Sequence, residues 1–162
     1  MAKITRIGYG QVEPNHLSAQ RTGQIYAQLP AVDSIEVLEN GQFVKYDYAS
    51  GKVNFDGEGE FMLVLNEVKL YDERETYKDF AMKKANYVGG VIVPRVFKTN
   101  VGDIYTTNMI DSAIEVEVNT KLAPNATGVL TTAGEDAEMI WKVVKVYTMA
   151  DGQAAVKLQR IK

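Results

Sequence analysis

Apolar and polar residues alternate along much of this chain in short stretches, which is the pattern of strands with one buried face. Residues 114–118 read Ile, Glu, Val, Glu, Val, so the apolar side chains fall on one face of a strand. Residues 60–68 are almost continuously apolar, and the run is short enough for a buried strand. Further strands are predicted at 34–38, 43–48, 91–97, 104–107, 140–147 and 154–161. This succession predicts a mainly β fold, an antiparallel β-sandwich or barrel.

Turn signals containing glycine separate these strands. Asn40-Gly41 and Asp151-Gly152 each lie between two β-rich runs, where such dipeptides are the strongest short signal for a hairpin. The most polar stretch, KTNVGDIYTTN at 98–108, predicts a turn at 100–103 followed by the strand at 104–107. Nothing nearby would activate one of its threonines, so we interpret this stretch as a joint between strands rather than an active site.

One short helix is predicted near 72–86. Acidic residues lie at its start, and Lys83 and Lys84 lie at its end, which complements the helix dipole. Tyr77 and Phe80 are three residues apart and belong to a narrow apolar stripe. The alternative interpretation is a long charged loop with a single helical turn.

Residues 1–30 have a different composition from the rest of the chain. They mix Gly, Gln, Asn and Pro with isolated apolar residues, and neither the strand period nor the helix period persists. We therefore expect an extended N-terminal arm at 1–30, ordered mainly where it lies on another surface, and a β domain at 31–162. Removing residues 1–25 is then expected to leave the thermal unfolding of the β domain nearly unchanged.

The chain contains a faint internal repeat. Ile35-Glu36-Val37 recurs as Ile114-Glu115-Val116, and Glu60-Phe61-Met62 recurs as Glu138-Met139-Ile140, so the two offsets are 79 and 78 residues. One interpretation is two related β halves, at 31–70 and 110–162. The other is chance similarity, which is common among β strands.

Composition narrows the classes of function. The 162 residues include no cysteine, which excludes disulfides, thiolate metal sites and cysteine nucleophiles and fits a reducing cytoplasm. A net charge of −3 argues against a general nucleic-acid-binding protein. The first residues lack the apolar run of a signal peptide, and no segment approaches the roughly 18 apolar residues of a membrane span. We therefore expect a soluble protein with neither nucleic-acid nor membrane partners.

The candidate catalytic and metal-binding residues are few. His16 is the single histidine, and it lies in the irregular arm, where nothing would hold it as a catalytic triad requires. Asp56, Glu58 and Glu60 alternate with glycines, and calcium favours such clustered oxygens, but the spacing is not that of a calcium loop. We predict no catalytic residues, no metal site and no cofactor.

Three segments resemble the head decoration (cement) proteins of tailed bacteriophages: NGQFVKYDYASGKV at 40–53, VGDIYTTNMI at 101–110 and WKVVKVYTMADGQAAVKLQRIK at 141–162. These are small β proteins without cysteines that carry an irregular N-terminal arm. The resemblance implies a non-enzymatic virion protein, made in the bacterial host cytoplasm, that binds the outer surface of an assembled capsid and stabilises it. Its implied partners are the major capsid protein and neighbouring copies of itself, with which it would form a homo-oligomer on the shell. The acidic segment at 72–86 is not part of this pattern.

The arm carries the residues that we predict to bind the capsid. Its apolar side chains would accompany strand addition to a sheet edge of a capsid subunit, and they are Ile4, Ile7, Tyr9, Leu17, Ile25 and Tyr26. A tail-tube or head–tail connector protein is the alternative, since these are also rich in β structure. A carbohydrate-active enzyme or a small-ligand-binding β domain is a less favoured alternative; such an enzyme would show adjacent buried carboxyl groups with raised pKa values.

Overall fold

The computed structural model describes residues 1–6, 8–16, 25–66 and 81–162, and nearly all of its regular structure is β. Its strands are β1 (Ala2–Lys3), β2 (Val12–His16), β3 (Ile25–Gln28), β4 (Val37–Leu38), β5 (Phe43–Asp47), β6 (Lys52–Asn54), β7 (Met62–Val64), β8 (Met82–Lys83), β9 (Arg95–Phe97), β10 (Ile104–Thr107), β11 (Glu115–Val116), β12 (Lys121–Pro124), β13 (Leu130–Thr132), β14 (Trp141–Thr148) and β15 (Ala154–Arg160). Two short 3-10 helices, η3 (Lys84–Asn86) and η4 (Val88–Gly90), follow β8.

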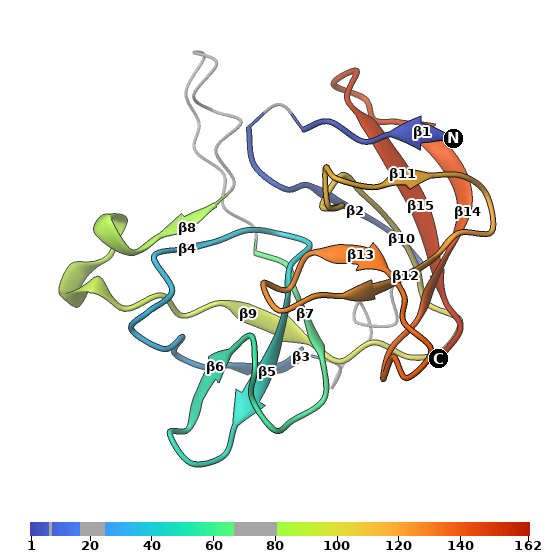
Figure 1. The fold of residues 1–162 in the computed structure, drawn as a ribbon. Coiled ribbons are helices and arrows are strands. Elements are labelled where there is room, and N and C mark those ends of the chain that lie inside the picture. The colour runs from blue at the N-terminus through green and yellow to red at the C-terminus, as the bar shows by residue number, and fades with distance from the viewer. Residues whose placement is uncertain (7, 17–24, 67–80) are drawn as a thin grey trace.

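The strands form two sheets and two ribbons (Figure 1). The larger sheet has the order β13-β12-β14-β15-β10-β2, and the smaller has the order β3-β9-β7-β5-β6. β1 pairs with β11, and β4 pairs with β8, as two-stranded ribbons. The pairs of named strands are antiparallel, so the predicted class of a mainly β antiparallel fold is confirmed.

The centre of the smaller sheet, at β7, is buried on both faces. Along β7, Leu63 joins an apolar cluster shared with the larger sheet, whereas Met62 and Val64 join a second cluster. Successive side chains of a strand point to opposite faces of its sheet, so the two clusters lie on opposite sides of β7. A strand covered on both faces has no solvent-facing positions, which is why all three residues of β7 are apolar.

The cluster shared by the two sheets has an aromatic centre. The ring of Trp141 lies edge-on to the ring of Tyr105, and their centroids are 4.8 Å apart. The centroids of the Trp141 and Phe43 rings are 6.0 Å apart. All three side chains are fully buried. The Tyr105 hydroxyl and the Trp141 indole nitrogen have no hydrogen-bond partner among the residues that the structure describes. Burial raises the pKa of Tyr105 well above its ordinary value, so the phenol stays neutral.

Replacing Tyr105 with Phe is expected to leave stability unchanged or to raise it by about 1 kcal/mol. The substitution removes a hydroxyl whose burial is not offset by a hydrogen bond, and it keeps the edge-on ring contact. Urea unfolding followed by Trp141 fluorescence measures the change. Tyr105→Leu, which loses the ring contact, should be clearly destabilising, and a loss of several kcal/mol in the Phe variant would show that the hydroxyl has a partner.

The two sheets repeat one strand order. Read from β6, the smaller sheet runs β6-β5-β7-β9-β3, and the larger sheet runs β13-β12-β14-β15-β10 before its extra strand β2. Adding 79 to the residue numbers of β3 (25–28) gives those of β10 (104–107). Adding 78 to those of β6 (52–54) gives those of β13 (130–132). These offsets equal those of the short sequence similarities. The matched pair β9 (Arg95–Phe97) and β15 (Ala154–Arg160) does not share the offset, so the repeat in sequence covers the other four strand pairs.

The repeat extends to a matching turn. The Gly41 N–H donates to the Val64 carbonyl at 2.9 Å, and the Asn119 N–H donates to the Val143 carbonyl at 2.8 Å. Gly41 and Asn119 both have positive φ, 90° and 76°. Glycine adopts such a conformation without strain and asparagine tolerates it, which explains why these residue types occupy the two turns.

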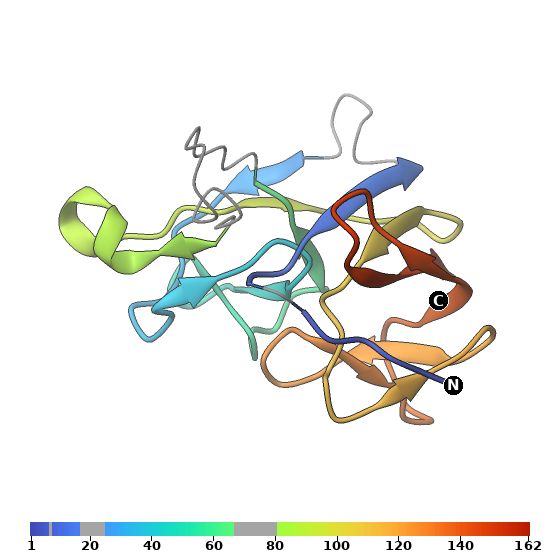
Figure 2. The same cartoon turned by 90° about the horizontal axis from the view of Figure 1, so that it is seen from above.

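The N-terminal segment is paired within the chain, which differs from the expected arm. β1 pairs with β11, β2 forms the edge of the larger sheet against β10, and β3 pairs with β9 in the smaller sheet. β4 and β11 hold matching places in the repeat, so β1 gives the second half the ribbon partner that β8 gives the first. Figure 2 shows β1 and β2 lying against the other strands.

The turn at Asn40-Gly41 is present, but it closes no hairpin, and the hairpin prediction there was wrong. The Gln42 N–H donates to the Glu39 carbonyl at 3.3 Å, which closes the turn. β4 then pairs with β8, whereas β5 pairs with β6 and β7, because each strand buries its apolar face against a different partner. The Asp151-Gly152 prediction is confirmed, since β14 and β15 form a long hairpin around it.

The helix prediction at 72–86 is wrong for the part that the structure describes. Residues 81–86 contain β8 and η3, and the earlier part of the range lies outside the described residues. Met82 is almost fully buried and pairs with Leu38, so tertiary packing rather than local helix propensity determines the conformation there.

The stretch at 98–108 forms the predicted turn and strand. The Asp103 N–H donates to the Asn100 carbonyl at 3.0 Å, and β10 follows. The buried Asn108 accepts from the Gln11 N–H at 2.7 Å and donates to the Gln153 side chain at 3.3 Å. These polar groups therefore connect β10 to the N-terminal segment and to the β14–β15 turn.

Candidate functional site

The predicted capsid-binding residues differ in how far they are buried in the structure and in what they contact. Ile4 is 1% exposed and belongs to the cluster between the sheets, so its side chain is part of the core. Tyr9 is half-buried, and its ring centroid lies 4.7 Å from the Lys83 ammonium on β8. Ile25 and Tyr26 belong to β3, of which only the backbone is described there. Ile7 and Leu17 lie outside the described residues. Of the two whose side chains the structure describes, Ile4 and Tyr9, it is Tyr9 that lies beside an exposed surface.

That surface is a projection formed by residues 82–93, which extends from the side of the molecule in both views (Figures 1 and 2). Val88 is fully exposed, and Val91 and Val93 are 42% and 41% exposed. Gly89 and Gly90 both have positive φ, and the turn that they form directs Val88 into solvent. Three exposed valines within six residues of one projecting segment make it a candidate surface for contact with another protein.

The base of the projection is held firmly. The Lys84 ammonium donates to the Asp33 carbonyl at 2.6 Å and pairs with the Glu36 carboxylate at 3.3 Å. The Lys84 N–H donates to the Glu36 carbonyl, and the Ala31 N–H donates to the Ile92 carbonyl. A surface held in this way loses little conformational entropy when a partner binds.

The β4–β8 ribbon has one inward and one outward face. Leu38 lies opposite Met82, and both are buried in the second cluster. Val37 lies opposite Lys83, and directly opposite residues of an antiparallel pair share a face, so these two point outward. The Tyr9 ring contacts Lys83, which brings Tyr9 to the same outward face as the 40% exposed Val37.

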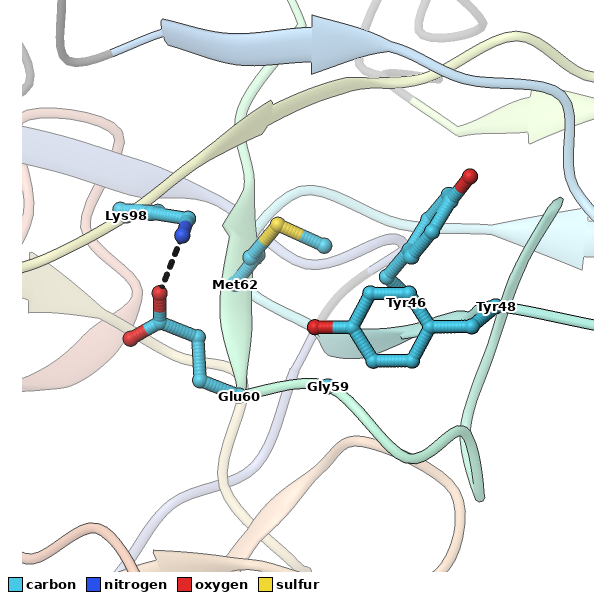
Figure 3. A pocket seen from close by; sticks show the side chains of 6 residues that line it. All are labelled: Tyr46, Tyr48, Gly59, Glu60, Met62 and Lys98. Carbon is cyan, nitrogen blue, oxygen red and sulfur yellow. Dashed lines mark ion pairs between the residues drawn. The ribbon is translucent and has the colours of Figure 1, made fainter. Parts of the chain in front are cut away.

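A second candidate site is a small open pocket beside the smaller sheet (Figure 3). It has a volume of about 150 Å³ and is lined by Tyr46, Tyr48, Gly59, Glu60, Met62 and Lys98. The rings of Tyr46 and Tyr48 meet edge-on with centroids 5.0 Å apart. On the opposite side, the Lys98 ammonium lies 2.6 Å from the Glu60 carboxylate, and both side chains are about half-exposed. The pocket thus has an aromatic wall facing a charged pair.

Two glycines let the chain pass close to the aromatic wall. A Cβ at Gly57 would lie 2.6 Å from the Tyr46 carbonyl oxygen, and one at Gly59 would lie 3.1 Å from the Tyr46 Cβ. The alternating Asp-Gly-Glu-Gly-Glu stretch at 56–60 therefore serves close packing beside β5 rather than only an exposed turn. Its last residue, Glu60, is the pocket carboxylate.

The residues considered for catalysis and metal binding are not brought together. His16 lies on β2, with its backbone paired to Ile104. Across the described ranges, no group of three His, Asp or Glu side chains is placed to hold a metal ion. Hydrogen bonds from the Ser50 hydroxyl and the Ala49 N–H lower the pKa of the Asp47 carboxyl, which therefore stays ionised and closes a turn.

Sequence patterns had indicated strands at both sites without identifying either as a site. Val91 and Val93 follow the two glycines and lie in the strand predicted at 91–97, whereas Val88 precedes the glycines and lies outside every predicted strand. Tyr46 and Tyr48 are two residues apart, a spacing that places both on one side of an extended segment. This spacing was the feature of the sequence that could have indicated the pocket.

No helix in the part of the chain that the structure describes has the length and apolar character needed to cross a membrane. Comparisons with models of protein families, with curated proteins and with solved structures found no match.

Proposed function

We propose that this chain is a non-enzymatic structural protein of a phage virion that binds the outer surface of an assembled capsid and stabilises it. The resemblance of residues 40–53, 101–110 and 141–162 to decoration proteins suggests this class. The observation that carries the proposal is the projection at 82–93, where exposed valines stand on a firmly held turn. Such a surface suits a permanent contact with another protein.

In this proposal the projection meets the capsid subunit, and Val88 is its central contact. Val88, Val91 and Val93 supply apolar area, while Lys83 and Tyr9 supply polar and aromatic contacts at the side. A capsid shell offers many identical sites. Even modest contacts then give firm attachment when neighbouring copies also touch one another, because the second contact is effectively intramolecular.

Replacing Val88 with Asp is expected to abolish binding to the capsid while leaving the fold intact. The side chain is fully exposed, so the charge costs little in the free protein, but it would be desolvated in the contact. Co-sedimentation with mature capsids measures binding, and a fixed saturating ratio per shell subunit is expected for the unchanged protein.

Val101→Asp is the matched control, because Val101 is a 66% exposed valine on the turn at 100–103, outside the projection. It should bind like the unchanged protein. Equal loss in both variants would point to a general charge effect. If the unchanged protein fails to bind capsids and assembles into rings or tubes, the tail-tube or connector alternative replaces the proposal.

A further inference from the structure

We propose that the pocket between Tyr48 and the Lys98–Glu60 pair binds a neutral sugar ring, an activity independent of capsid attachment. Its volume of about 150 Å³ is small for a drug-sized ligand, whose pockets usually exceed about 300 Å³. Protein cavities of about 150 Å³ are known to hold one six-membered ring. Because this pocket is open to solvent, it can receive the ring of a pyranose while the outward hydroxyl groups stay in water.

The arrangement of the lining groups matches the two surfaces of a pyranose. Tyr48 is 63% exposed, so its ring is available to a ligand, and the half-buried Tyr46 supports it edge-on. In Figure 3 the Tyr48 hydroxyl points toward Met62 and Glu60. The C–H face of a sugar packs on an aromatic ring, while its hydroxyl groups can donate to the Glu60 carboxylate and accept from the Lys98 ammonium.

Charge in the pocket favours a neutral ligand. The Lys98 ammonium and the Glu60 carboxylate lie 2.6 Å apart and balance each other. Burial lowers the pKa of the nearby Arg160, and the Glu60 and Asp103 carboxylates oppose that shift, so the Arg160 guanidinium adds positive charge near the pocket that disfavours a cation. An anion would in turn be repelled by the Glu60 carboxylate. A polar ligand without net charge avoids both penalties.

The matching half of the chain indicates that the fold does not require the aromatic wall. With the offset of 78 residues that relates β6 to β13, Tyr46 and Tyr48 correspond to Pro124 and Ala126. The turn is built in the same way in both halves: Asp47 accepts from the Ala49 N–H, and Asn125 accepts from the Thr127 N–H. The same strand and turn therefore form in the other half without tyrosines, so folding of this segment does not require the two rings.

The test is chemical-shift mapping of the full chain by NMR with glucose, galactose, mannose and N-acetylglucosamine, each titrated through the millimolar range. At least one pyranose should give saturable shifts at the amides of Tyr48, Gly59 and Lys98. Choline and acetate, a cation and an anion, should not. Absence of saturable shifts with every pyranose, or saturable shifts with choline or acetate alone, would overturn the proposal.

Variants connect the shifts to the pocket. Tyr48→Ala should abolish them, whereas Tyr147→Ala, which removes a half-buried tyrosine outside the pocket, should keep them. Glu60→Gln should weaken binding by about tenfold or more, because a hydrogen bond to a charged acceptor becomes one to a neutral acceptor. Both pocket residues are substantially exposed, so melting temperatures should match that of the unchanged protein. Binding that persists in Tyr48→Ala would also overturn the proposal.

Discussion

Removing residues 1–16 is expected to abolish cooperative folding of the chain, because this segment supplies core, strands and hydrogen bonds to the rest. Its loss removes the buried Ile4, and large-to-small changes at such positions alone remove about 2–5 kcal/mol. It also removes β1 and β2. The Asn108 and Thr107 side chains lose their hydrogen bonds to Gln11, and each lost bond removes about 0.5–1.5 kcal/mol. Together these losses approach the roughly 5–15 kcal/mol of a typical domain.

Two hydrogen bonds to the Glu39 carboxylate strengthen this expectation. The carboxylate, on a side chain only 16% exposed, accepts from the Arg6 guanidinium and from the Gly10 N–H, both at 2.6 Å. These two contacts join the N-terminal segment to the turn before β5. The sequence pattern had predicted a detachable arm, and the observed pairing gives the opposite expectation.

Circular dichroism during thermal and urea unfolding measures the effect of the truncation. Two point variants separate the core contribution from mere shortening of the chain: Ile4→Ala should lose about 2–5 kcal/mol, whereas the exposed Lys3→Ala should lose less than about 0.5 kcal/mol. If the truncated chain unfolds cooperatively with nearly unchanged stability, the segment is a detachable arm after all.

Replacing Gly128 with Ala is expected to destabilise the protein by at least about 3 kcal/mol, because two independent penalties act at this position. Gly128 has a φ of 74°, which strains any residue with a Cβ. That Cβ would also collide with the carbonyl oxygen of Phe43 and lie 3.0 Å from its amide nitrogen. The Phe43 N–H donates to the Gly128 carbonyl at 2.8 Å, so relieving the collision breaks a contact between the two halves of the chain.

Two other glycines separate the penalties in the same unfolding experiment. Gly102 has a φ of 97° but nothing within 4 Å of an added Cβ, so Gly102→Ala tests strain alone and should cost about 1–2 kcal/mol. Gly134 has neither positive φ nor a close neighbour, and Gly134→Ala should change stability by less than about 0.5 kcal/mol. A Gly128 variant no less stable than the Gly102 variant would show that the turn can move away from Phe43.

Local patterns in the sequence determined the fold class and many of the joints. The turn at 100–103, β10 and the β14–β15 hairpin follow from nearby residues, because glycine conformation and β propensity act over a few positions. The offsets of 78 and 79 residues were also visible in the chain before any strand was placed. These features depend on residues close in sequence, or on direct comparison of two stretches.

Tertiary structure alone decided which strands pair and which surfaces stay exposed. Nothing local distinguishes Asn40-Gly41 from a hairpin turn; β4 pairs with β8 because Leu38 and Met82 bury against the second cluster. The polar composition of the N-terminal segment hid its role, since its hydrogen-bond partners are distant in sequence: Glu39 for Arg6 and Gly10, and Asn108 for Gln11. The valine projection and the Tyr48 pocket likewise depend on distant neighbours. Burial depends on how the sheets pack together, so it cannot be deduced from any single stretch of the chain.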